Sequence, residues 1–456
     1  MKKFIETLKN IWKIEDLRNR ILYTLGLLLI FRVGTFITLP GVDPVELKRL
    51  VEANGTGGLL GLFNTFAGGA FYRAGIFALG IMPYISASIV MQLLTLVVPT
   101  FQKIQKDGES GRRKINQYTR FLTVVITAFQ AIAYVAFLKS GQSGLSGAVD
   151  NLNGIFPIST LIILTAGTLF VMWLGEKITD GGIGNGVSLL ITVGIIAGLP
   201  SALIGEFSAK TTSGGGALVF FIELLFLLGV VLVTIALVQA TRKIPVQYAK
   251  RMVGRGGKMA EVGGARQFIP LKLNASGVMP IIFAQALMFL PSTIAGFVGG
   301  GQAPTGILAE LSNPFSLISS VLTFFLVVIF TYFYTALIIN PNQMADDMKK
   351  NGGFIPGVRP GKKTASFIEG ILDRITLPGS IFLGLIAILP TFAQLAGVNA
   401  NFALFYGGTS LLIMVAVVLD TLQQIESHLL MRHYDGLMKS GKSINKGGRS
   451  RVGASV

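Results

Sequence analysis

Long apolar runs alternate with shorter polar segments along almost the whole chain. A transmembrane helix needs about 20 mostly apolar residues, and a sliding window of about 19 residues detects such runs. Ten runs are found, at residues 21–39, 74–98, 121–138, 155–174, 187–204, 217–240, 278–298, 315–339, 375–395 and 402–419. We therefore predict an all-α polytopic membrane protein with ten transmembrane helices.

One further apolar run, residues 57–70, is too short to cross a bilayer. It follows the first predicted span and leads directly into the second. An irregular or half-length segment is found within the hydrocarbon region only where other parts of the protein bury it or where it lines a water-filled cavity. We expect a re-entrant half-helix here. The alternative is an apolar surface turn in an outer loop.

Composition agrees with a membrane protein and argues against several kinds of chemistry. Apolar residues make up 51% of the chain and charged residues only 13%, and cysteine is absent. The two histidines, His428 and His433, lie in a polar tail without acidic ligands at metal-binding spacing. No GxxxxGK[ST] motif is present, and the glycines of residues 181–186 follow a span rather than a strand, so they indicate a tight turn. We expect no catalytic site, metal or cofactor.

The charges are distributed unevenly between the two faces. The segments before, between and after the spans on one face hold 33 of the 39 Lys and Arg residues, and those on the other face hold four. Basic residues mark the cytoplasmic side, so we predict that both termini are cytoplasmic. The expected divisions are an amphipathic N-terminal helix (1–20), a first half (21–206), a second half (207–421) and a basic tail (422–456).

Five spans per half would make the two halves inverted repeats. The second half carries large basic loops at residues 241–274 and 340–374, and the net charge of +17 is concentrated on this face. Such loops suggest the docking of an acidic partner, with ribosomal RNA as one candidate. The alternative is contact with anionic lipid alone.

The spans contain few ionisable residues. Arg32, Glu223 and Asp420 are the exceptions, and none has an evident partner at the same depth. An ion-coupled transporter would need such groups near the midplane. Aliphatic residues instead lie beside helix breakers, and a constriction lined by them would gate by dewetting. The alternative is that they merely face lipid or pack inside the bundle.

Several motifs resemble the SecY family, the central subunits of bacterial protein-export channels, and the resemblance covers residues 14–440. The motifs are ALGIMPYISASIVMQLL (78–94), GESGRRKINQYTR (108–120), MWLGEKITDGGIGNGVS (172–188), FIPGVRPGKKTA (354–365) and GGTSLLI (407–413). The resemblance implies a clamshell of two five-helix halves that passes unfolded secretory polypeptides across the bacterial cytoplasmic membrane. It also implies lateral release of transmembrane segments into that membrane. The rival function is an ion- or solute-coupled secondary transporter with inverted repeats.

The same resemblance implies particular site residues and partners. A hydrophobic pore ring would be formed by Ile81, Ile85, Val187, Ile191, Ile282 and Ile413. A plug at residues 57–70 would include Leu59, Leu60, Leu62, Phe63, Asn64 and Phe66. Partner contacts fall on Arg359, Lys250, Arg251 and Arg255. The implied partners are the small subunits SecE and SecG, the motor ATPase SecA, the ribosome, signal peptides, nascent chains and anionic lipids.

Overall fold

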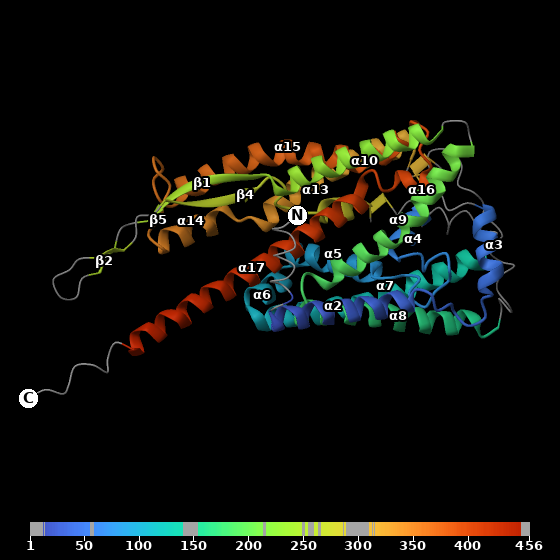
Figure 1. Ribbon diagram of the computed structural model, residues 1–456, viewed down its shortest axis with the longest axis horizontal. Coiled ribbons are helices and arrows are strands. Elements are labelled where there is room, and N and C mark those ends of the chain that lie inside the picture. Colours follow the sequence, from blue (N-terminus) through green and yellow to red (C-terminus); the bar gives the residue numbers. More distant parts are fainter. Residues whose placement is uncertain are drawn as a thin grey trace, which may run out of the picture.

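A computed structural model gives the fold as an elongated bundle of long helices with a small β-structure at one end (Figure 1). The structure describes residues 12, 14–54, 59–139, 154–212, 216–248, 251–253, 260–262, 266–285, 287–288, 310–311, 313 and 315–447. Most of the predicted segment 1–20 therefore lies outside the described residues. Its last part belongs to the first long helix, α2, which begins at Glu15.

The long helices lie side by side, roughly along the long axis of the bundle (Figure 1). They are α2 (Glu15–Gly34), α5 (Met82–Val97), α7 (Glu109–Lys139), α8 (Phe156–Gly181), α9 (Gly186–Thr212), α10 (Gly216–Gln239), α13 (Leu317–Ile338), α15 (Lys362–Leu395) and α17 (Gly408–Gly447). Shorter helices are α3 (Pro44–Asn54), α4 (Leu59–Phe66), α6 (Pro99–Lys106), α14 (Pro341–Lys350) and α16 (Ala400–Ala403). The chain is thus a multi-span helical membrane protein in outline.

Seven described helices are long and apolar enough to cross a membrane, or eight if one bent pair is counted as a span. These seven correspond to the third to sixth and eighth to tenth predicted spans. The bent pair is Met82–Thr95 with Pro99–Gln105, which meet at 101°. The seventh predicted span lies largely outside the described residues. The count of ten spans therefore remains a prediction.

The second predicted span is only partly helical. The prediction placed its start at residue 74, but the chain makes successive turns from Ala67 to Ile81 before α5 begins at Met82. Gly69 and Gly80 adopt positive φ angles of 88° and 55° there, which a helix does not contain. Pro83 then occupies the first turn of α5, where a missing N–H costs no hydrogen bond.

A small β-structure, absent from the all-helical prediction, occupies the end of the bundle that carries the basic loops (Figure 1). Strand β1 (Thr241–Tyr248) pairs antiparallel with β4 (Arg266–Lys272) and with β5 (Gly353–Phe354), and β2 (Arg251–Val253) pairs with β3 (Ala260–Val262). Ile244 and Val246 alternate with exposed residues along β1. Both pack into a cluster with residues of α14 and α15.

Elements from the two ends of the chain occupy different parts of the bundle. In Figure 1, α2, α7 and α8 lie along one side, whereas α10, α13 and α15 lie along the other. Each side has its own core, represented by Leu164 and Tyr134 in the first and by Val327 and Leu383 in the second. A third apolar cluster contains residues from both sides. This shared cluster positions the candidate site.

Candidate functional site

All six residues of the predicted pore ring lie in the apolar cluster that both sides share. Ile81, Ile85, Ile191 and Ile413 are buried members, and Val187 and Ile282 pack against it. Ile81 and Ile85 are four residues apart at the start of α5, and Val187 and Ile191 are four apart at the start of α9, so each pair shares a helix face. Four separate segments thus contribute these residues to one apolar cluster.

Helix α4 forms the half-length piece that the sequence predicted, inside the expected range 57–70. It holds the predicted residues Leu59, Leu60, Leu62 and Phe63, of whose side chains nothing is described, together with Asn64 and Phe66. The Phe66 ring is buried in the shared apolar cluster. At Gly194 of α9, an added Cβ would come within 2.8 Å of the Phe66 carbonyl oxygen. Helix α4 therefore packs closely against α9.

A turn after α4 is fixed by Asn64. Its carbonyl oxygen accepts from the Gly69 N–H at 2.7 Å, and its side-chain Oδ1 accepts from the Tyr72 N–H at 3.0 Å. Arg32 of α2 donates to the Gly68 carbonyl oxygen at 2.6 Å. The turn is thus held both by its own side chain and by the first long helix.

A hydrogen bond joins the two sides of the bundle between α5 and α13. The Tyr334 hydroxyl donates to Gln92 Oε1 at 2.8 Å. The Tyr334 ring packs edge-on against Phe283, with centroids 4.9 Å apart. Phe283 follows Ile282 directly in the seventh predicted span, so this contact lies beside the apolar centre.

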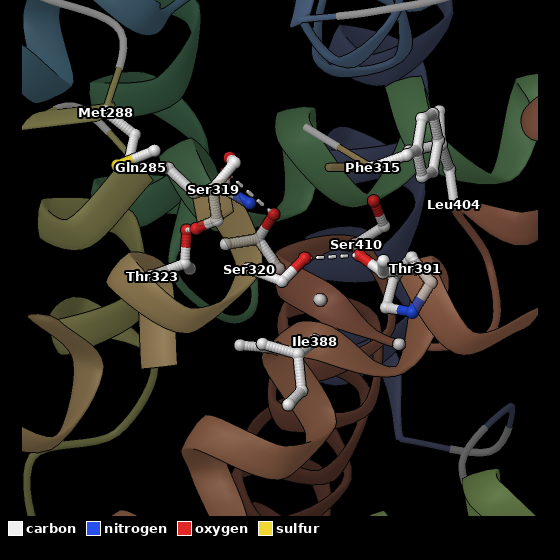
Figure 2. Close-up of a pocket in the computed structure, with 15 residues that line it drawn as sticks. Gln285, Met288, Phe315, Ser319, Ser320, Thr323, Ile388, Thr391, Leu404 and Ser410 are labelled. Atoms are coloured by element: carbon white, nitrogen blue, oxygen red, sulfur yellow. Dashed lines mark hydrogen bonds between the residues drawn. The ribbon is translucent and has the colours of Figure 1, made fainter. Parts of the chain in front are cut away.

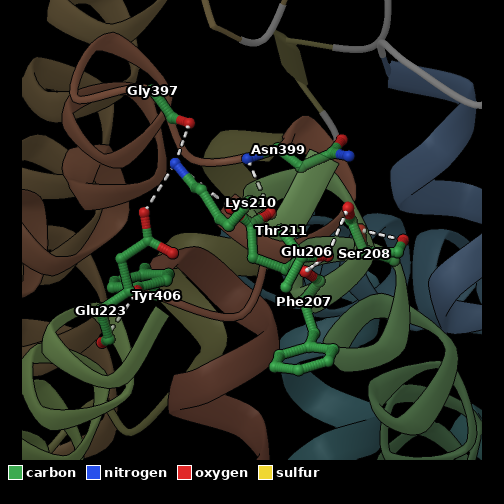
Figure 3. A network of polar contacts seen from close by, with 10 residues as sticks. Glu206, Phe207, Ser208, Lys210, Thr211, Glu223, Gly397, Asn399 and Tyr406 are labelled. Carbon is green, nitrogen blue, oxygen red and sulfur yellow. Dashed lines mark hydrogen bonds and ion pairs between the residues drawn. The ribbon is translucent and has the colours of Figure 1, made fainter. Parts of the chain in front are cut away.

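A buried ion cluster joins the end of α9 to the start of α10 (Figure 3). The Lys210 ammonium lies 2.9 Å from a carboxylate oxygen of Glu223 and 3.6 Å from one of Glu206. It also donates to the Gly397 carbonyl oxygen at 2.7 Å, and Glu206 accepts from the Asn399 N–H at 3.0 Å. The expectation that Glu223 lacks a partner is therefore wrong, because Lys210 reaches it from the preceding helix, α9.

A hydroxyl-lined cavity of about 60 Å³ lies beside the apolar centre in the second side of the bundle (Figure 2). Ser320 and Thr391 share a hydrogen bond of 2.6 Å, and Thr409 donates to Gln285 Oε1 at 2.9 Å. Gln285 lies about one helical turn beyond Ile282, and Thr409 about one turn before Ile413. The cavity therefore places hydroxyl and amide groups next to the shared apolar cluster.

Two of the four predicted partner residues, Arg359 and Arg251, are described, and both lie at the β-structured end. Arg359 is exposed in the loop before α15, and it lines an open groove with Lys362, Lys363 and Phe367. None of these three cations forms an ion pair within the part of the chain that the structure describes. Lys250 and Arg255 lie outside the described residues. Arg251 lies in strand β2.

The sequence analysis missed the polar contacts between elements. Glu206 and Lys210 have the i, i+4 spacing of a helical ion pair, which was a readable signal. Gln92 and Tyr334 are 242 positions apart, so nothing local joins them. No group of three His, Cys, Asp or Glu residues that could hold a metal occurs among the described residues.

Fold and site together define a polytopic α-helical membrane protein with an apolar cluster shared by its two sides. The SecY family model matches residues 75–422. Protein translocase subunits SecY from Streptomyces galbus and Mycobacterium bovis are 46% and 42% identical to the chain. The alignments cover 94% and 96% of this chain and 98% and 99% of the relatives. The chain belongs to the SecY family, as its motifs predicted.

Solved structures give the same fold. A protein-conducting channel matches with a TM-score of 0.64 at 20% identity, covering 90% of this chain and 91% of the other. Sec61 in a canine ribosome-channel complex from the endoplasmic reticulum matches with a TM-score of 0.57 at 19% identity and the same coverage. The predicted helical fold class is confirmed.

Proposed function

We propose that the chain is the pore subunit of a protein-conducting channel. It passes unfolded secretory polypeptides across the bacterial cytoplasmic membrane and releases transmembrane segments sideways into it. The observation that carries this proposal is the convergence of six aliphatic residues from four segments on one centre, with Phe66 of α4 beside them. Membership in the SecY family and the names of its relatives support the same function.

An apolar ring suits a substrate of variable sequence. Aliphatic side chains exclude water and ions from a narrow constriction, and they make no specific hydrogen bond to a passing chain. Helix α4 is the plug: it does not span, and it leaves the centre when a polypeptide enters. Its packing against Gly194 and the turn at Asn64 keep it in place when the channel is idle.

Sideways release uses the boundary between α5 and α13, where Gln92 and Tyr334 meet. Opening here exposes a translocating segment to lipid, and an apolar segment then partitions by its own transfer free energy. The inverted arrangement of the halves 21–206 and 207–421 gives both sides of this boundary equivalent freedom to separate.

Docking of cytoplasmic partners uses the groove at Arg359. Three cations at the N-terminal end of α15 are unfavourable beside the positive end of a helix dipole, and an anionic partner removes that cost. The partners are SecA and the ribosome, joined at the loops 241–274 and 340–374. The other proposed partners are SecE and SecG, signal peptides, nascent chains and anionic lipids. Both termini are cytoplasmic, and the tail 422–456 lies on the same face.

The chain performs no chemistry of its own, and work is supplied by a partner or by chain synthesis. An ion-coupled transporter is disfavoured because the predicted spans contain few ionisable residues. The ionisable cluster at Lys210 instead lies where α9 ends and α10 begins.

Transport tests the proposal directly. The chain with its small subunits is reconstituted in liposomes with SecA and ATP, and import of a signal-bearing polypeptide is measured by protease protection. We expect import, and we expect deletion of residues 57–70 to raise ion leak in the idle channel. Ile162→Ala, an exposed change on α8, is the matched control and leaves the leak unchanged. Absence of import, with ion-driven uptake of a small solute, would establish the rival function.

Docking is tested separately with Arg359→Glu. Reversal of the charge in the groove removes an attraction to phosphate or carboxylate groups and adds a repulsion, so ribosome and SecA binding is expected to fall about tenfold or more. Lys350→Glu is the control, since Lys350 is exposed nearby and pairs with Asp347 at 3.9 Å. Unchanged binding of the Arg359 variant in sedimentation assays would remove this loop from the docking surface.

A further inference from the structure

Two arginines lie together at the outer end of α2 without an acidic partner. Arg32 belongs to the last turn of α2, and Arg73 belongs to the turns that follow α4. Their guanidinium carbons lie 4.9 Å and 4.4 Å from the centroid of the same Phe36 ring. Neither arginine forms an ion pair with any residue that the structure describes.

The positive charge of this pair is not balanced by any acidic residue that the structure describes. Two like charges close together repel, and the repulsion grows where apolar surroundings lower the local dielectric constant. The Phe36 ring face offsets part of this cost through cation–π contacts. Arg32 also donates one N–H group to the Gly68 carbonyl oxygen, which carries no formal charge. An anion is the group that would balance the remaining charge.

The position of the pair indicates which anion. Leu22, Leu25, Leu29 and Val33 recur at helical spacing along α2, and all are at least half exposed, as is Phe36. This exposed apolar stripe is suited to contact with acyl chains. The charged start of α2, with Glu15 and Asp16, lies at the other end of the helix from Arg32, and the stripe lies between them. Arg32 therefore lies at the end of the stripe away from the predicted cytoplasmic end, and a long guanidinium side chain there can reach phospholipid phosphates at the outer boundary of the membrane core.

We propose that Arg32, Arg73 and Phe36 bind the phosphate diester of an outer-leaflet phospholipid. Guanidinium groups present paired N–H donors that match phosphate oxygens, and Arg73 is exposed with its donors free of any described protein acceptor. Arg32 adds a second cation at the same ring. The acyl chains lie along the stripe that ends at Val33, and Phe36 packs at the level of the glycerol backbone.

The bound lipid also touches the base of the plug. Arg32 contacts the lipid phosphate with one part of its fork and Gly68 with another, so the lipid stabilises the turn that follows α4. This consequence rests on the proposed function of α4. The lipid site itself does not depend on it.

Photo-cross-linking tests the site. The full channel complex is reconstituted with a phospholipid that carries a diazirine next to its phosphate, and labelled peptides are located by mass spectrometry. We expect labelling of peptides that contain residues 32–36 or 68–73, and about a tenfold loss of it in Arg73→Gln. Arg49→Gln is the matched control, since Arg49 is exposed in α3 and pairs with Glu46 at 3.7 Å. Arg73→Lys keeps the charge and retains most of the labelling.

Equal labelling of the wild type and Arg73→Gln would overturn the proposal. So would loss of labelling when millimolar inorganic phosphate is added, because the site would then take free phosphate rather than lipid. The assay uses idle channels and needs no transport. A channel that labels as expected but imports no polypeptide keeps the lipid site and overturns the proposed function.

Discussion

Two of the boundaries between the sides of the bundle are built from different interactions. Between α9 and α10, Lys210 bridges two carboxylates, and the side chain of Glu206 is completely buried. Between α5 and α13, one hydrogen bond between neutral groups, from Tyr334 to Gln92, joins the described residues. The α9–α10 boundary thus contains ion pairs, whereas the described polar contact at the α5–α13 boundary is one hydrogen bond from a tyrosine hydroxyl.

The difference determines which boundary can open. Separation of a buried cation from two carboxylates would leave charges without partners, which costs several kcal/mol. Breaking a neutral hydrogen bond costs about 1 kcal/mol. For the proposed channel, we therefore expect the α9–α10 boundary to act as a hinge and the α5–α13 boundary to act as a seam that a signal segment can part.

Loss of the hinge cation gives the largest expected effect. Lys210→Met leaves Glu206 and Glu223 buried without a counterion, and we expect a loss of about 3–5 kcal/mol in the free energy of unfolding. Thermal unfolding of the detergent-solubilised complex measures this loss. Lys210→Arg, which keeps the charge, is the control and retains most of the stability. A Lys210→Met protein as stable as the wild type would mean that charge does not hold this boundary.

Removal of the seam hydroxyl, with a matched control, sharpens the comparison. Tyr334→Phe deletes the seam bond. Tyr406→Phe is the control, because it deletes a bond of 2.8 Å from the Tyr406 hydroxyl to the Glu223 carbonyl oxygen that lies within the second side of the bundle. Each should cost about 1 kcal/mol. Only Tyr334→Phe should increase export of a polypeptide with a weakly apolar signal, by up to about fivefold. Equal gains in both variants would show that general loosening, rather than the seam, controls entry.

The smallest effect is expected in the ring that both boundaries enclose. Val187→Ile adds one methylene group to the apolar centre, worth about 0.8 kcal/mol when buried. We expect ion leak through the idle channel to fall slightly, by less than about fourfold. Val230→Ile, a comparable change in a separate cluster, should leave the leak as it is. Increased leak in Val187→Ile would indicate an overpacked centre.

Long apolar runs predicted the spanning helices well, because a helix that crosses a bilayer needs about 20 mostly apolar residues in one continuous stretch. This signal failed where glycines interrupt an apolar run, as at Gly69 and Gly80 before α5. The strand β1 was missed because its short alternation at Ile244 and Val246 lies inside a basic loop. Period-2 patterns of this length are easily hidden by flanking charge.

Candidate residues of the ring could be named from motifs, but contacts between distant elements could not. Glu223 looked unpartnered because its cation, Lys210, precedes it on another helix, and the two meet only after the chain turns back. The Gln92–Tyr334 bond has no sequence signature at all. Pairings of this kind depend on how helices pack, which local hydrophobicity does not encode.

Helix α15 has a mechanical consequence. It begins at Lys362 in the basic groove and ends at Leu395, two residues before the Gly397 carbonyl that accepts from Lys210. With 34 residues it is about 50 Å long. For the proposed channel, a motor docked at the groove would therefore apply force at one end of α15, and the helix would transmit it as torque toward the loop that contacts Lys210.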